Sequence, residues 1–370
     1  MSAGVRHLYV HLPFCAHRCG YCDFVTAVGR RDEHPRYADA LLAELERERP
    51  RLGEPLETVF IGGGTPTFTE PAALVRMLDA LPSAGEVTVE ANPETVTPAL
   101  AAILREGGVN RVSLGAQSFR PKLLEVLERV AGPDDVRRAV QTLRDAGFDN
   151  ISLDLIYGIP GQSAADLEAD IADALALEPE HLSCYELEAK PGTRFTHAHG
   201  DELARQAEAM EGYAERIVES LTGAGYRWYE MANFCRPAGG RDLRAQHNLA
   251  IWRGADYLGI GVGAVSTLGA ERRRNLPSVA RYVAALERGE APPHEVEQLD
   301  PPTRAVERLM LGLRLDEPFA VAAAGVENVV DADALERLTV AGLVDRVGEG
   351  VRLTPRGRML GGAVTAELLA

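Results

Sequence analysis

The sequence lacks the features of a secreted, membrane-spanning or nucleic-acid-binding protein. No apolar stretch approaches the roughly 18 residues that a membrane span needs, and the N-terminus has no signal-peptide pattern. Basic residues are in deficit, because 39 Lys and Arg stand against 55 Asp and Glu, which gives a formal net charge of -16. This balance argues against a general binder of phosphate backbones. We therefore expect a cytoplasmic protein that binds no nucleic acid, with loose peripheral membrane contact left open.

Cysteine is also scarce, with five residues in 370, yet three of the five lie within eight positions. These three are Cys15, Cys19 and Cys22. Three thiolates on one loop suit zinc or an iron-sulfur cluster, whereas a chain without a secretory signal rarely uses clustered cysteines for disulfides. His17 lies among them and could complete a zinc site, while a cluster with three protein ligands would leave one iron open. Cys184 and Cys235 are isolated and are expected to be buried.

Short apolar runs alternate with helical patterns over the first half of the chain. The runs expected to form strands cover residues 8–12, 58–62, 86–91, 111–115, 150–158 and 181–187. Apolar residues recur at helical spacing between them, and Ser163 with Asp166 resembles a capping box. Strands that alternate with helices form a parallel sheet. We therefore predict an α/β fold whose six strands curl into a whole or partial barrel.

The polar residues of this region fall where such a barrel carries its chemistry. Parallel barrels build their sites from the loops at the C-terminal ends of the strands. The cysteines follow the first expected strand, a triple glycine at 62–64 follows the second, and Glu90, Gln117 and Asp154 lie in or after the next three. A carboxylate inside an apolar strand is costly unless it is paired. Glu90 and Asp154 are therefore expected to face a ligand or a structural arginine.

The pattern changes after the sixth expected strand. We expect a long amphipathic helix over 201–221, a strand over 226–234 and a solvated loop at 271–275. His247, Asn248 and Trp252 suit a capped turn with a core aromatic, which residue chemistry alone favours. They also suit a porphyrin site, with an imidazole and a flat stacking face.

The last part of the chain has the pattern of a small separate unit. Helical patterns at 306–314 and 334–343 precede a hairpin at 344–353 and a final helix, a combination that resembles a winged-helix module. We predict a core over residues 1–235, a connecting region over 236–300 and an accessory domain over 301–370.

The spacing Cys-x3-Cys-x2-Cys, with Tyr21 just before the last cysteine, resembles the signature of the radical S-adenosylmethionine (SAM) superfamily. In that superfamily the three cysteines hold a 4Fe-4S cluster, and SAM chelates its open iron. The run Tyr-Val-His-Leu-Pro-Phe-Cys at 9–15 narrows the resemblance to the oxygen-independent coproporphyrinogen III oxidase family. The resemblance implies a radical SAM partial (β/α)6 barrel with a C-terminal helical, winged-helix-like accessory domain.

The same resemblance assigns residues to the two cofactors. It implies that Cys15, Cys19 and Cys22 hold the 4Fe-4S cluster. It implies that SAM is contacted by Tyr9, Tyr21, Gly63, Gly64, Thr65, Glu90, Gln117, Arg129 and Asp154. Arg129 is expected on the helix that begins at Pro121, where an ordinary surface arginine is the alternative.

The segment from His247 to Trp252 resembles the His-Asn-x-x-Tyr-Trp motif of the heme-chaperone branch of this family (HemW), with Ile251 in place of the tyrosine. The oxidases usually carry a fourth cysteine two residues beyond the third, where this chain has Phe24, and a long N-terminal extension, where only fourteen residues precede Cys15. Both departures favour a heme chaperone that carries heme, a 4Fe-4S cluster and SAM and delivers heme to apo-proteins. His247, Asn248 and Trp252 are its candidate heme residues.

Two other functions stay open at this point. One is oxygen-independent coproporphyrinogen III oxidase, which decarboxylates two propionates by radical chemistry. The other is a zinc-bound interaction protein without a redox role. The expectation is a radical SAM family member without oxidase activity, so enzyme status is left open. A homodimer is implied by the family resemblance alone.

Overall fold

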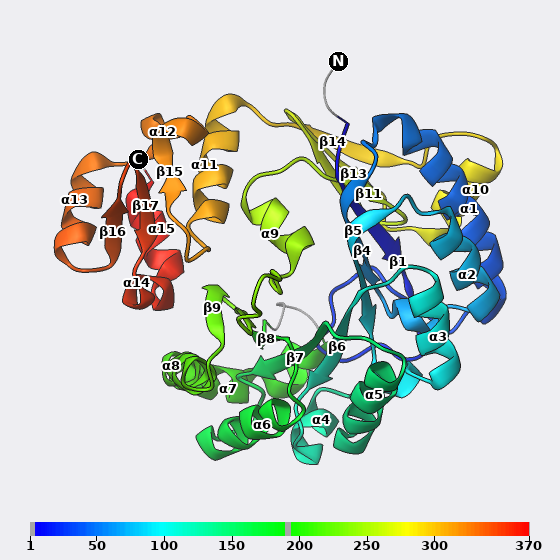
Figure 1. Ribbon diagram of the computed structural model, residues 1–370, viewed down its shortest axis with the longest axis horizontal. Helices are drawn as coiled ribbons and strands as arrows, with labels where there is room; N and C mark the ends of the chain where they lie inside the picture. Colours follow the sequence, from blue (N-terminus) through cyan, green and yellow to red (C-terminus); the bar gives the residue numbers. More distant parts are fainter. Residues whose placement is uncertain (1–3, 189–193, 370) are drawn as a thin grey trace.

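A large curved sheet forms the centre of the computed structural model, which describes residues 4–188 and 194–369 (Figure 1). In these two stretches the sheet follows the order β11 (Leu258–Ile260), β1 (His7–Leu12), β4 (Leu56–Gly63), β5 (Ala84–Ala91), β6 (Arg111–Gln117), β7 (Ile151–Tyr157), β8 (His181–Glu186), β10 (Asn233–Cys235) and β9 (Arg227–Glu230). Neighbours from β11 to β8 are parallel, and β10 and β9 add antiparallel strands. The six predicted strands and the partial barrel are confirmed. A separate short pair joins β2 (Phe14–Cys15) and β3 (Ala27–Val28).

Helices cover the outer side of the curved sheet (Figure 1). They are α1 (His34–Glu48), α2 (Pro71–Ala80), α3 (Pro98–Glu106), α4 (Pro121–Val126), α5 (Pro133–Asp145), α6 (Ala164–Ala176), α7 (Arg194–Ala207) and α8 (Met210–Gly223). Val10 and Leu12 of β1 pack outward against this layer. Because side chains alternate along a strand, Tyr9 and His11 face the inside of the barrel. The inner face is thus free to carry polar groups.

The helix starts follow the local signals of the sequence. Pro98 and Pro121 occupy the first turns of α3 and α4, where a missing N–H costs no hydrogen bond. Ser163 and Asp166 form the predicted capping box: Asp166 N donates to Ser163 Oγ at 3.2 Å, and Ser163 N donates to Asp166 Oδ2 at 2.9 Å. The capping-box prediction is confirmed.

The predicted helix over 201–221 is wrong, because two helices occupy this region. Gln206, near the end of α7, donates from Nε2 to the Gln162 carbonyl at 2.9 Å. Tyr213 of α8 donates to the same carbonyl at 2.8 Å. In one straight helix these two residues would be separated by about 10 Å along the axis. The break between α7 and α8 brings both side chains to one acceptor.

The predicted strand over 226–234 is a hairpin instead. β9 and β10 pair antiparallel around residues 231–232. The buried carboxylate of Glu230 accepts hydrogen bonds from Ala232 N at 3.0 Å and from Asn233 Nδ2 at 2.7 Å. These bonds fold the chain back on itself, and Glu230 and Asn233 within an apolar run are the sequence signal for the turn.

A second, smaller sheet has the order β12 (Val265–Leu268), β13 (Glu271–Asn275) and β14 (His294–Gln298), with α10 (Val279–Glu287) between β13 and β14. The predicted solvated loop at 271–275 is wrong, because these residues form β13. Arg273 is buried there, and its Nη1 lies 3.1 Å from Glu48 Oε1. The basic run is therefore ordered by its pairing.

The C-terminal unit lies to one side of the curved sheet (Figure 1). It has a hydrophobic core of its own. Its elements are α11 (Pro301–Gly312), β15 (Phe319–Ala320), α12 (Val321–Ala324), α13 (Ala332–Val340), β16 (Val344–Val347), β17 (Gly350–Leu353), α14 (Pro355–Met359) and α15 (Gly361–Leu368). The predicted helices and hairpin are confirmed, and β15 adds a third strand. Arg358 lies 3.6 Å from the Trp228 ring centroid, and Arg314 pairs with buried Glu230 at 2.6 Å. The predicted domain boundaries stay predictions.

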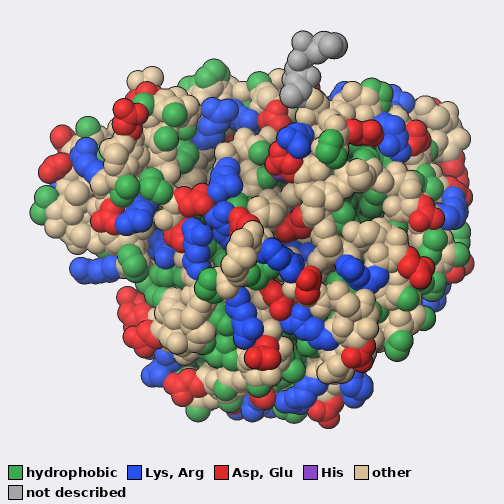
Figure 2. Space-filling model, in the orientation of Figure 1, with side chains coloured by type: hydrophobic (Ala, Val, Ile, Leu, Met, Phe, Trp, Pro, Cys, Tyr) green, Lys and Arg blue, Asp and Glu red, His purple; other side chains and the backbone are tan. Residues whose placement is uncertain are grey.

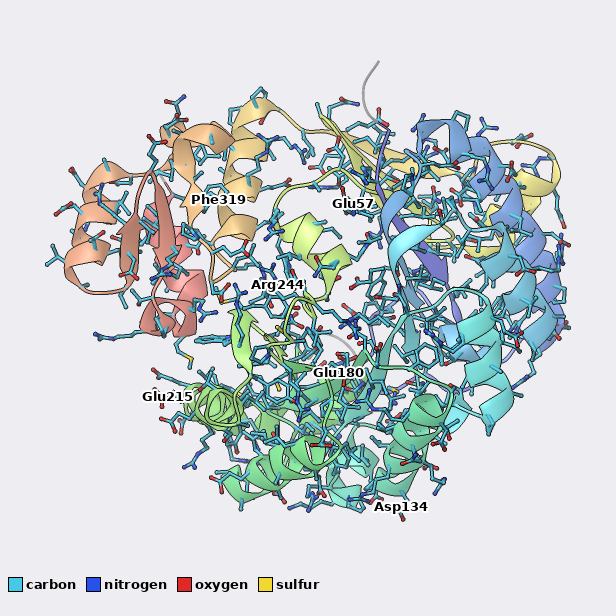
Figure 3. The ribbon with its side chains drawn as sticks, in the orientation of Figure 1. Glu57, Asp134, Glu180, Glu215, Arg244 and Phe319 are labelled. Atoms are coloured by element: carbon cyan, nitrogen blue, oxygen red, sulfur yellow. The ribbon has the colours of Figure 1, made fainter. Side chains whose placement is uncertain are left out.

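Ion pairs also join the C-terminal unit to α9 (Gln246–Trp252). The carboxylate of Glu317 pairs with Arg244, which lies at this junction in Figure 3, and with Arg253 at 2.6 Å. Arg244 precedes α9 and Arg253 follows it. Both ends of this short helix are therefore tied to one carboxylate.

Basic and acidic side chains are interspersed on the face of the molecule shown in Figure 2. Over the molecule as a whole, many charged side chains form ion pairs, such as Arg36 with Glu287 and Arg227 with Asp316. None of the described helices is long and apolar enough to cross a membrane.

Glu44 connects α1 to the strands that close the barrel on the β1 side. Its buried carboxylate accepts hydrogen bonds from Tyr282 OH at 2.5 Å, Gly261 N at 2.7 Å and Asn275 Nδ2 at 2.8 Å. We expect Glu44→Ala to lower the free energy of unfolding by about 3–5 kcal/mol, because it leaves buried donors without an acceptor. Urea denaturation followed by circular dichroism measures this loss.

The matched control for this prediction is Glu46→Ala, on the same helix. Glu46 is exposed and, among the residues that the structure describes, pairs only with Arg49, so the change should stay within about 0.5 kcal/mol. A loss below about 1 kcal/mol for Glu44→Ala would contradict the role given to the carboxylate.

Candidate functional site

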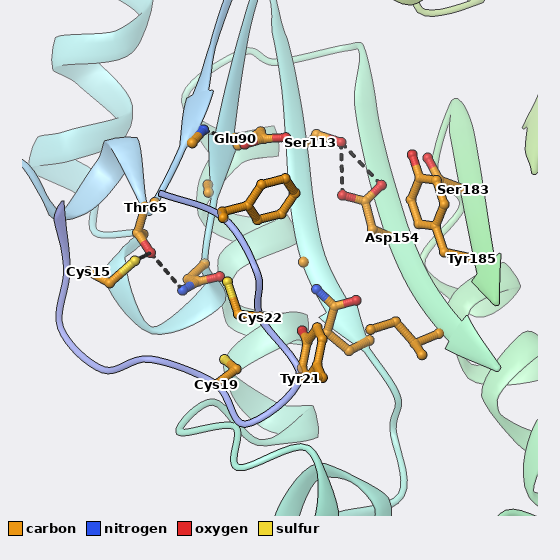
Figure 4. Close-up of a pocket in the computed structure, with 18 of the residues that line it drawn as sticks. Cys15, Cys19, Tyr21, Cys22, Thr65, Glu90, Ser113, Asp154, Ser183 and Tyr185 are labelled. Atoms are coloured by element: carbon orange, nitrogen blue, oxygen red, sulfur yellow. Dashed lines mark hydrogen bonds between the residues drawn. The ribbon is translucent and has the colours of Figure 1, made fainter. Parts of the chain in front are cut away.

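The C-terminal ends of the parallel strands enclose a cavity of about 390 Å³, here called the cysteine cavity (Figure 4). Its lining includes most of the predicted residues, namely Cys15, Cys19, Tyr21, Cys22, Gly63, Gly64, Thr65, Glu90, Gln117, Arg129 and Asp154. This size is within the range of small-molecule sites, about 300–1,000 Å³. Tyr9 does not line this cavity and lies in a second one described below.

The three cysteines lie on a loop, residues 15–22, that follows β1 (Figure 4). The pairing of β2 with β3 closes the base of this cysteine loop, where Gly29 N donates to the Cys15 carbonyl at 2.8 Å. Gly64 lies against the same base, because a Cβ there would be 2.6 Å from the Pro13 carbonyl oxygen. Only glycine allows so close an approach. The glycine run therefore packs the end of β4 against the cysteine loop.

His11 and Tyr9 hold the chain just beyond the cysteines from inside the barrel. His11 Nε2 lies 2.9 Å from the Val25 carbonyl, and Tyr9 OH lies 3.0 Å from His11 Nδ1. Burial lowers the pKa of His11, so a neutral ring donates from Nε2 and accepts the tyrosine proton at Nδ1. Tyr9 thus supports the cysteine loop indirectly.

A chain of hydrogen bonds connects two of the cysteines through the ends of several strands. Arg129 Nη1 lies 3.6 Å from Cys19 Sγ, and Nη2 donates to Asn92 Oδ1 at 3.0 Å. Asn92 Nδ2 donates to Thr65 Oγ1 at 3.1 Å, and Thr65 donates to Cys15 Sγ at 3.5 Å. The guanidinium and the hydroxyl stabilise negative charge on the two sulfurs. Asn92, directly after β5, was not predicted.

The prediction that Arg129 lies on the helix that begins at Pro121 is wrong, because α4 ends at Val126. Glu128 has a left-handed backbone, with φ of 55°, which ends the helical path and turns the next residue into the cavity. Arg129 Nη2 also donates to the Gly115 carbonyl at 3.0 Å. The alternative of an ordinary surface arginine does not fit this placement.

Two partly buried carboxylates, Glu90 and Asp154, face the cavity from β5 and β7 (Figure 4). Gly63 N donates to Glu90 Oε2 at 3.1 Å, and Ser113 Oγ donates to Asp154 Oδ2 at 3.1 Å. Burial, and then the charge of Asp154, raise the pKa of Glu90 to about 7. Burial likewise raises the pKa of Asp154. Such a pair attracts a cation and accepts hydrogen bonds from hydroxyl groups.

Gln117 reaches the cavity from the end of β6 with a left-handed backbone, φ of 64°. This conformation is uncommon for residues other than glycine. A Cβ at Gly115 would lie 2.7 Å from Gln117 Nε2, so the glycine makes room for the side chain. Unfavourable backbone conformations of this kind cluster at functional sites.

Several inward-facing residues were not predicted from the sequence. Arg111 is 2% exposed and lines the cavity, where its charge favours the ionised forms of Glu90 and Asp154. Arg111 and Ser113 both lie on the inner side of β6, and Ser183 lies on the inner side of β8. A polar residue at every second position of an apolar strand is the signal that could have identified them.

The cysteine loop has the chemistry of an iron-sulfur site. Burial raises the pKa of Cys15 and of Cys22, so their thiolates need nearby positive charge. Arg129 supplies some to Cys15 and Arg18 some to Cys22, and bound iron would supply more. Over the described chain, no three His, Cys, Asp or Glu side chains converge as they would around one metal ion. A cubane is wider than a single ion and takes thiolates that are further apart. The donor set therefore fits a three-cysteine cluster.

A second cavity of about 440 Å³, here called the aromatic cavity, lies beside the first. The two cavities share lining residues, namely Asp23, Phe24, Phe60 and Asn248. Apolar side chains form much of the aromatic cavity, among them Tyr9, Phe24, Val25, Phe60, Ile251, Tyr257 and Val265. Phe24 is 62% exposed. Together with the other apolar residues of this cavity it forms a contiguous apolar surface, and such surfaces often mark ligand-binding grooves.

The short helix α9 places His247 and Asn248 at the wall of the aromatic cavity. Glu86 fixes the first turn of α9, because its Oε1 accepts a hydrogen bond from His247 N at 3.2 Å. His247 is 2% exposed, and its Nε2 has no hydrogen-bond partner in the described chain. Burial lowers the pKa of His247 to about 3, so the ring is neutral near pH 7. Trp252, at the other end of α9, packs near Tyr229 and is outside the lining of both cavities.

Comparisons with known proteins agree with this geometry. Residues 9–174 match the radical SAM superfamily, and residues 299–360 match the HemN C-terminal domain. The chain is 35% identical to the heme chaperone HemW of Mycobacterium tuberculosis, over 98% of this chain and 94% of that one. It is 34% identical to the heme chaperone HemW of Bacillus subtilis, with 99% of each chain covered. The chain belongs to the HemW family of the radical SAM superfamily.

The fold of this HemW-family chain is similar to that of a solved structure. The coproporphyrinogen III oxidase HemN from Escherichia coli, described as a radical SAM enzyme, superposes with a TM-score of 0.81 at 23% identity. The match covers 99% of this chain and 90% of that chain. At this identity the likeness concerns the fold alone. The predicted radical SAM partial barrel with a C-terminal accessory domain is confirmed.

Proposed function

We propose that this HemW-family protein binds heme and delivers it to apo-proteins, and that it carries a 4Fe-4S cluster and SAM beside the heme. The observation that supports the proposal best is the shared wall, because Phe24, Phe60 and Asn248 line both cavities. A cofactor in the cysteine cavity and a flat ligand in the aromatic cavity would therefore be neighbours. The relatives' name, heme chaperone, points to the same function.

The cysteine cavity would hold the cluster through Cys15, Cys19 and Cys22. When bound, a reduced cluster supplies the single electron that radical SAM chemistry needs. The chain itself would bind and orient SAM, whose amino group would meet the backbone of Gly63, Gly64 and Thr65. Polar side chains would surround the rest of the cofactor, namely Tyr21, Glu90, Gln117, Arg129 and Asp154.

The aromatic cavity would hold heme. Its aromatic walls match the apolar faces of a porphyrin. Heme iron takes an imidazole ligand in many proteins, and His247 Nε2 is a buried nitrogen with no partner in the described chain. Asn248 joins this wall to the cysteine cavity. Trp252 supports α9 from its far end and stays a heme candidate by motif only.

Arg274 offers the charge that a heme carboxylate requires. It lines the aromatic cavity from β13. Its two neighbours on the strand are already paired, Arg272 with Glu307 at 2.7 Å and Arg273 with Glu48 at 3.1 Å. Arg274 has no ion pair with any residue that the structure describes. An unpaired arginine at the edge of an apolar cavity suits a propionate.

SAM binding is expected to tighten as pH rises. SAM carries a sulfonium charge, which attracts ionised Glu90 and not the protonated acid. With a pKa of about 7, the ionised fraction of Glu90 increases about tenfold between pH 6 and pH 8, so the dissociation constant should fall by about that factor. Equilibrium dialysis with the reconstituted protein measures it. Glu90→Gln is the control and should flatten this part of the profile, whereas tighter binding at pH 6 would contradict the prediction.

Three measurements test the proposed function. Protein purified without oxygen should be brown, contain iron and sulfide, and bind one hemin per chain in a spectroscopic titration. Heme-loaded protein should then pass heme to an apo-hemoprotein faster than heme dissociates into buffer. Catalytic conversion of coproporphyrinogen with SAM and a reductant would establish the oxidase instead, and a colourless zinc form would favour an interaction protein.

A further inference from the structure

Three residues behind the aromatic cavity are connected in a row that ends on His247. Glu57 Oε2 lies 3.7 Å from His7 Nε2. His7 Nδ1 lies 3.0 Å from Thr58 Oγ1, and the same oxygen lies 2.8 Å from His247 Nδ1. Glu57 is exposed near the start of β4 (Figure 3), whereas the other three are buried. The row therefore leads from the surface to the wall of the aromatic cavity.

One arrangement of protons suits every atom in this row. The carboxylate of Glu57, whose Oε1 also pairs with Arg6 at 2.9 Å, attracts the His7 proton to Nε2 by its charge across 3.7 Å. His7 Nδ1 is then an acceptor, and the hydroxyl of Thr58 donates its proton to it. The remaining contact of the Thr58 oxygen is a hydrogen bond that His247 Nδ1–H donates.

The opposite tautomer of His247 fits this row less well. Nε2 has no partner in the described chain with or without a proton, so this nitrogen alone does not decide the tautomer. A proton on Nε2 would, however, require Thr58 to donate to His247 and His7 to point an unprotonated Nε2 at Glu57. The contact between His7 and Glu57 therefore favours the proton on Nδ1 of His247.

We propose that Thr58, His7 and Glu57 are positioning residues that fix His247 with a bare Nε2, ready to ligate heme iron. This inference rests on the proposed heme function. Histidines that ligate metals usually donate their other ring N–H to a partner, which sets the tautomer and the orientation of the ring. Loss of such a partner typically weakens metal binding about 10–100-fold.

The tautomer can be measured without heme. Protein labelled with ¹⁵N in histidine, compared with His247→Gln to assign the signal, should show Nδ1 of His247 protonated and Nε2 unprotonated. Thr58→Val removes the hydroxyl with little change in shape, and the His247 signal should then move toward the other tautomer. Thr58→Ser keeps the hydroxyl and should preserve the wild-type signal. A protonated Nε2 in the wild type would overturn the proposal.

Hemin titration supplies the second measurement. Thr58→Val should bind hemin about 10–100-fold more weakly, with an altered Soret band, and Thr58→Ser should restore both. Thr69→Val is the matched control, because Thr69 is also buried and its hydroxyl has no partner in the described chain. Equal affinity and spectrum in Thr58→Val and wild type would overturn the positioning role.

The two measurements separate this proposal from the proposed function. If wild-type protein binds no hemin, heme binding fails as a function, and with it the role of the row toward iron. If hemin binds normally but His247 has its proton on Nε2, the heme function stands and the positioning proposal is wrong.

Discussion

Cys19→Ser is expected to remove nearly all iron and sulfide from protein purified without oxygen, and SAM binding with them. A cubane with three protein ligands loses a third of its attachment when one thiolate is replaced, and Arg129, 3.6 Å from Cys19 Sγ, loses the charge that it faces. SAM should then bind more than tenfold more weakly. Even the loss of a residue that only hydrogen-bonds to a metal ligand lowers metal affinity or activity by about 10–100-fold. Metal analysis, sulfide assay and spectroscopy of the reduced protein measure the result.

Cys19 suits this test better than Cys15, because Cys19 is partly exposed whereas Cys15 is buried at the base of the loop. Cys235→Ala, which removes an isolated buried cysteine, should keep the full iron content. Arg129→Gln should give an intermediate result, with the cluster present but SAM bound more weakly. Full iron in Cys19→Ser would show that the cysteine loop does not hold the cluster.

Much of the barrel could be predicted because its signals are local. Strands β1, β4, β5, β6, β7 and β8 coincide with short runs rich in apolar residues, and Pro98, Pro121 and the Ser163 capping box mark helix starts within a few residues. Strand β11 could not be found in this way. It has three residues and pairs with β1 across the chain, Leu8 opposite Leu258. Such a pairing depends on contacts between distant segments.

The same difference between local and distant signals applies to the site. Glu90 and Asp154 could be predicted because a carboxylate in an apolar strand needs a reason. Asn92 could not, because its role follows from lying between Arg129 and Thr65. Arg129 was assigned to the wrong element, since the turn at Glu128 has no glycine or proline to announce it.

The motif at residues 247–252 shows how structure changes the meaning of a sequence pattern. Residue chemistry alone favoured a capped turn with a core aromatic, and both parts of that interpretation are present: Glu86 caps α9, and Trp252 packs near Tyr229. What the pattern could not show is that His247 keeps one nitrogen without a partner at a cavity wall. A structural turn and the proposed heme site therefore share one short helix.

His247→Ala is expected to remove the spectrum of histidine-ligated heme. It should also weaken hemin binding by more than the roughly 10–100-fold that is typical when a residue that hydrogen-bonds to a metal ligand is lost. The reason is the loss of the proposed iron ligand itself, in a cavity whose other walls remain. Optical titration and resonance Raman spectroscopy measure both effects. His294→Ala, which removes an exposed histidine on β14, is the control for nonspecific binding and should match the wild type.

Added imidazole distinguishes a lost ligand from a damaged fold. In His247→Ala the space left by the ring lies beside Thr58, whose oxygen is 2.8 Å from Nδ1 in the native protein, so free imidazole can donate to the same oxygen and present its other nitrogen to the iron. Imidazole should therefore restore the histidine-ligated spectrum in His247→Ala, and less effectively in the double variant with Thr58→Val. Unchanged affinity and spectrum in His247→Ala, before any imidazole is added, would remove this residue from the heme site.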